Sequence, residues 1–144
     1  MSHNITSRSR ENGQGLVEFA MVLVIMMILL AGVVDLGRAF FTFLSLRDAA
    51  QEGAAYASIN PGDSVNIINR VRNSSARPVN LNDTANIGVQ INLTGAACAG
   101  NGVEVLVTYD QFPLTMPFLG SILGAQTIPI RARITDTILT PPCK

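Results

Sequence analysis

The apolar positions of this 144-residue chain form one long run, followed by shorter periodic patterns. Residues 16–34 are apolar except for Glu18, which lies near the start of the run. About twenty apolar residues in a helix cross the ~30 Å hydrocarbon layer of a bilayer, so the run predicts a transmembrane helix. A carboxylate within such a helix is energetically costly and is typical of a functional position. Glu18 is therefore the first candidate residue.

The predicted helix continues well beyond the apolar run. The first strong helix breaker is Asn60-Pro61-Gly62, so we expect one helix over residues 14–60, with its transmembrane part at 16–34. At ~1.5 Å per residue this helix is roughly twice as long as a bilayer requires, and its second half should project from the membrane. Small residues recur there at three- and four-residue spacing, which indicates a face that another element can approach closely. They are Ala49, Ala50, Gly53, Ala54 and Ala57, and Leu46 begins the same stripe.

Residues 61–144 are predicted to form a small α+β head domain. Asp63 is placed to cap a short amphipathic helix. Its apolar positions are Val65, Ile68 and Val71, with Ile67 beside them. Apolar and polar residues then alternate over 87–93, 103–109 and 128–134, which predicts three antiparallel strands, the first two forming a hairpin. Pro129 cannot donate to a strand ladder, so it is expected at a strand start or on an edge strand.

An uncharged, apolar segment, residues 112–124, separates the second and third predicted strands. Its two prolines and two glycines argue against a second membrane span. Two interpretations remain open. The segment either covers the sheet or the long helix as a loop, or forms a patch that contacts a neighbouring subunit or the bilayer surface.

Composition and charge exclude several classes of function. Ten basic residues balance ten acidic residues, so the chain lacks the basic excess of a nucleic-acid-binding protein. The sole histidine is His3, which argues against a His-based metal site or nucleophilic triad. The acidic residues form no convincing pair, and the Gly-rich linker between the first two strands is not a P-loop. We therefore predict neither an enzyme nor a cofactor.

The residues before the apolar run predict its orientation. Arg8 and Arg10 favour a cytoplasmic N-terminus and an external C-terminus for a single-pass protein. A cleaved secretory signal is disfavoured because the run is too long and helical character continues beyond it. The lack of a cysteine near the run argues against a lipoprotein anchor. Asp35 and Arg38 are spaced to form an ion pair at the membrane boundary.

Two cysteines, Cys98 and Cys143, lie far apart in the sequence. If the third strand pairs antiparallel with the second, its end returns to the turn that holds Cys98. A disulfide is then expected outside the cytoplasm, and the alternative is two separate thiols. Closing a loop of this length contributes on the order of 4 kcal/mol in the chain-entropy model.

Two resemblances concern the N-terminal region. Gly13, the segment QGLVEF (residues 14–19) and the apolar run resemble the leader and helix of type IV pilins and pseudopilins. Residues 15–41 are more closely similar to the TadE/TadG-like proteins of the tight-adherence (Tad) pilus. The resemblance implies that a prepilin peptidase removes residues 1–13 as a leader. Gln14 then becomes the first residue, and Glu18 the fifth.

The resemblance also implies a structural role in a filament. Such a subunit inserts in the cytoplasmic membrane, is processed after Gly13 and assembles into a cell-surface adhesion filament through its apolar helix. Its partners are the lipid bilayer, the prepilin peptidase, the pilus assembly machinery and other pilin subunits. Glu18 is expected to pair with the terminal amine of a neighbouring helix. The alternative is an unprocessed, single-pass, membrane-anchored binding protein.

Overall fold

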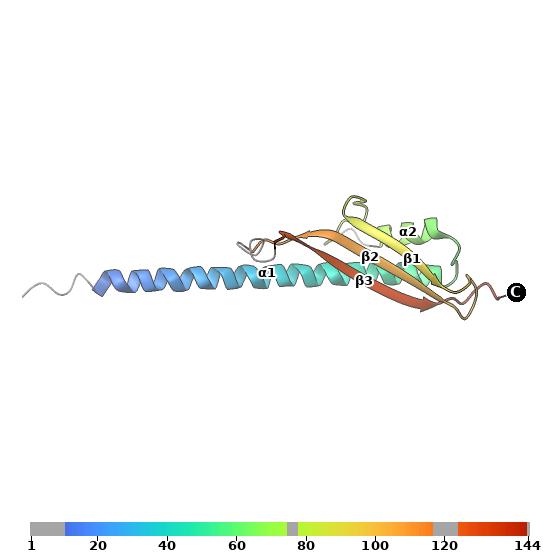
Figure 1. Ribbon diagram of the computed structural model, residues 1–144, viewed down its shortest axis with the longest axis horizontal. Coiled ribbons are helices and arrows are strands. Elements are labelled where there is room, and N and C mark those ends of the chain that lie inside the picture. Colours follow the sequence, from blue (N-terminus) through green and yellow to red (C-terminus); the bar gives the residue numbers. More distant parts are fainter. Residues whose placement is uncertain (1–10, 75–77, 117–123, 144) are drawn as a thin grey trace, which may run out of the picture.

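The structure is a computed structural model that describes residues 11–74, 78–116 and 124–143. One long helix carries a small head that lies along its second half (Figure 1). The elements follow in the order α1 (Glu11–Ala57), α2 (Ser64–Asn73), β1 (Ile87–Thr94), β2 (Gly102–Pro113) and β3 (Thr127–Thr137). This arrangement confirms the predicted α+β fold, with a long helix, a short second helix and a three-stranded antiparallel sheet.

Helix α1 begins at Glu11, before the predicted Gln14, and ends at Ala57, just before the predicted breaker. Its 47 residues correspond to a rod of roughly 70 Å. The head covers only the second half of this rod, and the first half extends away from it (Figure 1). Residues 1–10, which include most of the predicted leader, lie outside the described part of the chain.

The core of the head forms where one face of the sheet packs on α1. The small-residue face of α1 is fully buried, as predicted. The approach is closest at Gly53, where an added Cβ would overlap Cγ2 of Val71 on α2. Glycine is therefore required here by space rather than by backbone conformation. The sheet contributes a central row of fully buried residues from β2. These are Val103, Val105 and Val107.

Helix α2 presents a narrower apolar face than predicted. Asp63 caps it by accepting a hydrogen bond from the backbone N–H of Asn66, and the Asn66 side chain bonds the same carboxylate. These bonds hold the pKa of Asp63 below its ordinary value. Ile67 and Val71 are buried against α1, whereas Val65 is exposed. Val65 lies off the buried face because it is two residues, or ~200°, around the helix from Ile67.

The sheet has the order β1-β2-β3 with both neighbours antiparallel. The first two strands form the predicted hairpin, with Ile87 opposite Tyr109 and Leu93 opposite Val103. Strand β3 is an edge strand, which accommodates Pro129 as predicted. A register shift between Tyr109 and Phe112 interrupts its pairing with β2 next to this proline.

The chain after β3 returns to the far end of α1. The N–H of Leu139 donates to the carbonyl of Ser58, and the Thr140 hydroxyl donates to the carbonyl of Ile59. Carbonyl groups just past the end of a helix lack partners within it, so this tail satisfies polar groups that the end of α1 leaves free. Ile138 is buried in the same place.

Candidate functional site

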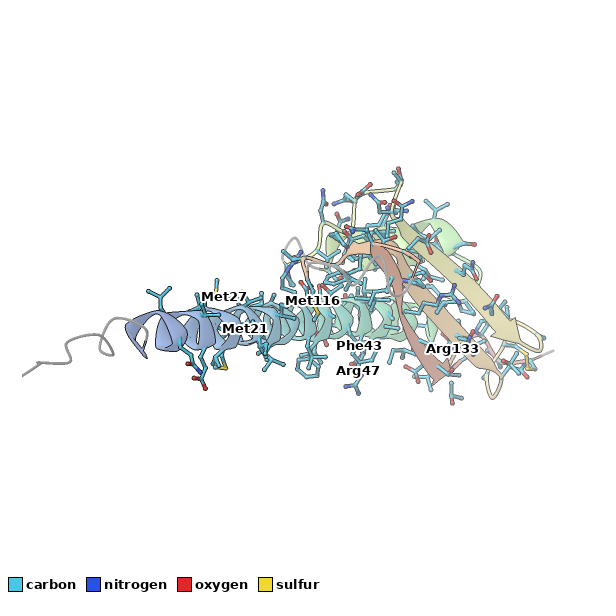
Figure 2. All side chains as sticks on the ribbon, turned by 60° about the vertical axis from the view of Figure 1, so that its left-hand side comes forward. Met21, Met27, Phe43, Arg47, Met116 and Arg133 are labelled. Carbon is cyan, nitrogen blue, oxygen red and sulfur yellow. A yellow bond between two sulfur atoms is a disulfide. The ribbon has the colours of Figure 1, made fainter. Side chains whose placement is uncertain are left out.

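The first half of α1 is an apolar surface that the head does not cover. None of the most apolar stretch of this helix is buried, and the helix is long and apolar enough to cross a membrane. Leu16, Phe19 and Met27 are each more than half exposed, and Figure 2 shows the side chains of this half projecting freely around the helix. A core helix of a water-soluble protein would bury such residues. Lipid or other apolar helices could cover this surface.

Glu18 lies on this bare surface, exposed and about 25 Å along the helix from Asp35. The ion pairs among the described residues are formed elsewhere, as Asp35–Arg38, Glu52–Arg70 and Glu104–Arg133. The carboxylate of Glu18 is thus free to meet a partner outside the described part of the chain.

The predicted processing site lies in the first turns of α1. Gly13 and Gln14 are both helical, and Glu18 follows Gln14 by four residues, one turn further along the same face. A Cβ added at Gly13 or at Gly15 would meet no atom within 4 Å. Gly13 and Gly15 both lower the helix propensity of this first part of α1.

A second site joins the apolar half of α1 to the head. Asp35, directly after the apolar run, is only 5% exposed. Its Oδ2 accepts hydrogen bonds of 2.7 Å from the backbone N–H groups of both Thr115 and Met116. The carboxylate thereby fixes the segment that follows β2 onto the long helix. Without this acceptor both amides would lose their hydrogen-bond partner in a partly buried place.

Arg38 completes this junction. Its guanidinium lies 3.4 Å from Asp35, which is the predicted ion pair, and it also donates to the hydroxyl of Thr115. The same group stacks 5.4 Å from the centre of the Phe112 ring, a cation–π distance. The pairing of Asp35 and Arg38 could be read from their spacing, but their partners lie about eighty residues away in the sequence and gave no local signal.

Met116 lies on the N-terminal side of this junction, against the apolar run of α1. Its Sδ lies 3.6 Å from where a Cβ would stand on Gly32. Figure 2 shows Met116 against α1, between Met27 and Phe43 along the helix. The described part of the uncharged segment thus covers the long helix, as one of the two interpretations predicted. Residues 117–123 of that segment lie outside the described residues.

An open cleft of about 460 Å³ lies beside the junction, between α1, residues 78–83 and the end of β2. Aromatic rings and Arg38 form much of its wall, and Asp83 supplies an opposite charge. Hydrogen bonds from the Asn86 side chain and the Ala85 N–H hold the pKa of Asp83 below its ordinary value, so this carboxylate stays ionised. The opposed charges argue against a simple anion site.

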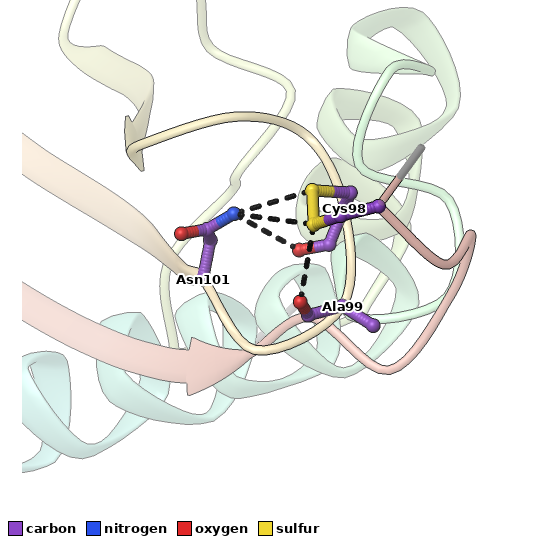
Figure 3. The surroundings of a disulfide bond; sticks show 4 residues. Cys98, Ala99 and Asn101 are labelled. Carbon is purple, nitrogen blue, oxygen red and sulfur yellow. Dashed lines mark hydrogen bonds between the residues drawn. A yellow bond between two sulfur atoms is a disulfide. The ribbon is translucent and has the colours of Figure 1, made fainter.

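The far end of the head is closed by the predicted disulfide, Cys98–Cys143, with a Cα–Cα distance of 5.0 Å (Figure 3). The Asn101 side chain donates to the carbonyl oxygen and the sulfur of Cys98. The N–H of Ala99 donates to the carbonyl of Pro141, so backbone hydrogen bonds also join the turn to the tail. Within the described residues no group of three His, Cys, Asp or Glu side chains is placed to hold a metal.

Fold and site together define a class of protein in which one long N-terminal helix, apolar enough to cross a membrane, carries a small α+β head. The family model of TadE-like proteins matches residues 13–55, almost all of α1. This match confirms the predicted resemblance, so the chain has a TadE-like N-terminal segment. The matched segment ends before α2. No curated protein and no solved structure matches the chain.

Proposed function

We propose that this protein is a structural subunit of a Tad-type pilus, either a pilin or a pseudopilin. The observation that carries the proposal is the bare apolar half of α1, which belongs to the segment matched by the TadE-like family and holds one carboxylate without a partner among the described residues. An apolar rod of this length can be surrounded by lipid before assembly and by identical or related helices afterwards. Lipid tails and neighbouring apolar helices can both cover this apolar surface.

The proposed sequence of events begins in the cytoplasmic membrane, with the head outside. A prepilin peptidase then cuts between Gly13 and Gln14, which creates a new terminal amine. The helix next leaves the bilayer and packs among neighbouring helices in a cell-surface filament that serves adhesion. The pilus assembly machinery supplies the work, and no chemical step by this chain is needed.

Glu18 would fix the position of each helix against the next. A carboxylate in an apolar helix bundle is costly unless it is paired. After cleavage the amine of Gln14 lies at the level of the first turn of a neighbouring helix, and it is the opposite charge nearest to the bundle core. The pair would favour one axial stagger, because a shift of one helix along another would leave two buried charges apart.

The alternative function is that of an unprocessed, single-pass anchor for an external binding domain. In this alternative, the ligand would bind in the open cleft beside Arg38 and Asp83 of the head. The two functions differ in the covalent structure of the protein, since only a pilus subunit needs the cut.

The test is the mass of the protein after co-expression with an active prepilin peptidase. We expect a chain that starts at Gln14. A pyroglutamate start would show the same cut, but it would remove the terminal amine with which Glu18 is proposed to pair. Gly13→Ala should retain the leader, whereas Gly15→Ala is a matched control that should be cut normally. Both glycines have open space around them, so neither change disturbs packing. Uncut parent protein in membranes that hold active peptidase would contradict the pilus proposal and favour the anchor.

A further inference from the structure

The end of the head nearest to the apolar run reaches below the boundary of that run. We call this end the membrane-proximal tip and define it as residues 112–116 and 124–126. Met116 lies on Gly32, which is one turn inside the apolar run and about 4.5 Å below Asp35. If residues 16–34 span the hydrocarbon layer, the tip stands at the level of the lipid headgroups and touches the hydrocarbon edge.

The position of the tip is fixed by hydrogen bonds. Asp35 holds the N–H groups of Thr115 and Met116, and the N–H of Leu114 donates to the carbonyl of Gln126 at 2.9 Å. The bond between Leu114 and Gln126 extends the pairing of β2 and β3 beyond the strand ends, so the two arms of the tip are joined to each other. The tip therefore cannot rise away from the apolar run without breaking these bonds.

The composition of the tip suits the edge of a bilayer. The chain has no charged residue between Asp110 and Arg131, a stretch of twenty residues. The side chains of Leu114 and Met116 remain partly exposed in spite of their contacts. The charged groups at this level are Asp35, which is buried, and Arg38, whose half-exposed guanidinium contacts Thr115 and Phe112 of the tip. Long basic side chains at this level meet lipid phosphates.

We infer that the membrane-proximal tip rests in the outer headgroup layer of the bilayer, with Met116 at the hydrocarbon edge. The head then lies on the membrane and contacts lipid directly, rather than standing clear of the membrane on the helix. The partner of this surface is a phospholipid bilayer. The inference rests on the membrane insertion of α1 in the proposed function, but it does not depend on cleavage or on filament formation.

The chain contains no tryptophan, so single-tryptophan variants report on one position each. The full chain is reconstituted in phosphatidylcholine vesicles whose acyl chains carry no bromine, bromine on the upper part of the chain, or bromine near the terminal methyl. The reporting variants are Met116→Trp and, as a smaller disturbance of the Gly32 contact, Leu114→Trp. Val24→Trp places the probe in the apolar run. Leu139→Trp places it at the far end of the head, about 35 Å beyond the run, where the Leu139 N–H bonds the carbonyl of Ser58.

We expect lipid brominated on the upper part of its chains to quench most of the emission of the Met116 and Leu114 variants. Lipid brominated near the terminal methyl should quench that of the Val24 variant, because Val24 lies about 12 Å from Gly32 along the helix, near the middle of the run. The emission maxima of the two tip variants should also lie to the blue of the maximum of the Leu139→Trp variant. The Leu139→Trp probe should be unaffected by bromine and open to aqueous iodide. Intact-mass analysis of the Cys98–Cys143 bridge and circular dichroism confirm that each variant keeps its fold.

Two outcomes would overturn the inference, and they differ in meaning. If Val24→Trp is quenched while both tip variants behave like Leu139→Trp, the helix is inserted but the head stands clear of the membrane. If Val24→Trp is not quenched, the membrane anchoring itself fails, and the proposed function fails with it.

Discussion

The carboxylate of Asp35 accepts a hydrogen bond of 2.7 Å from the backbone N–H of Met116, a residue 81 positions further along the chain. Asp35 directly follows the apolar run, and Met116 lies against Gly32 within that run. The bond therefore joins the head to the end of the apolar run. Because Asp35 also holds the N–H of Thr115, the end of β2 is fixed relative to the membrane helix at two points. Asp35 therefore holds the end of the head nearest to the apolar run on α1.

The first prediction concerns this side chain. Asp35→Ala should lower the free energy of unfolding of the head by about 2 kcal/mol, a typical value for hydrogen bonds to a charged group whose partners are left buried. Asp48→Ala is the matched control, because Asp48 is an exposed acid further along the same helix. Its effect should stay within about 0.5 kcal/mol. Urea unfolding in detergent micelles, followed by circular dichroism, gives both values.

Hydrogen exchange separates this role from general destabilisation. In Asp35→Ala the amides of Thr115 and Met116 should lose protection, while those of Val103 and Val105 in the middle of β2 keep theirs. Equal loss of protection at both places, or none at either, would contradict a local role of Asp35 in holding Thr115 and Met116.

The second prediction concerns the crossing of α1 and α2. Gly53→Ala should destabilise the head by about 1–3 kcal/mol, because its Cβ would overlap Val71 and force the two helices apart. Gly37→Ala is the matched control on the same helix. A Cβ there meets no atom within 4 Å, so the change should stabilise α1 by roughly 0.5–1 kcal/mol.

A compensating variant tests the stated cause of that effect. Val71→Ala removes the atom that the new Cβ would strike, so Gly53→Ala should cost less in the Val71→Ala background than in the parent. Thermal unfolding of the four proteins provides the comparison. Additive effects of the two changes would show that the overlap is not the reason.

Much of the fold follows from periodicity in the sequence. The small residues of α1 repeat at three and four positions because one helix face must admit the sheet and α2 closely, and this face is indeed buried. The alternation in the strands likewise gave the buried row of β2. Irregular segments gave no such signal. Val79 and Leu81 are buried in a segment without periodic pattern, and their burial depends on tertiary contacts alone.

Only part of the candidate site could be predicted from the sequence. The apolar run and Glu18 could be recognised because a long uncharged stretch makes a single charge conspicuous. The pairing of Cys98 with Cys143 could be predicted because strand order determines which ends meet. The hydrogen bonds of Asp35 to Thr115 and Met116 could not be predicted, because the carboxylate binds backbone N–H groups, which every residue except proline carries. No side-chain pattern identifies which amides will be used.

The third prediction concerns the disulfide. Cys98→Ser should lower the free energy of unfolding by about 4 kcal/mol in the chain-entropy model, given the sequence separation of 45 residues. Mass analysis without reductant should find one intramolecular bridge in the parent. Ala97→Ser, which changes a neighbouring position in the same turn, should have little effect. Two free thiols in protein taken from the extracytoplasmic side would contradict the bridge.

The fourth prediction is that Glu18 governs assembly rather than folding or insertion. Glu18→Leu removes a charge from the apolar run, so insertion should become no harder, and the head, which starts about 25 Å away at Asp35, should fold unchanged. Incorporation into pili should nevertheless fall by roughly tenfold or more, because loss of one partner from a buried pair costs about 3–5 kcal/mol. Glu18→Asp, which keeps the charge on a shorter side chain, should retain part of the incorporation. Membrane level, cleavage after Gly13 and pilus content are measured together. If Glu18→Leu protein is cleaved and enters filaments as well as the parent does, the carboxylate has no partner in the filament and its pairing with a neighbouring amine is wrong.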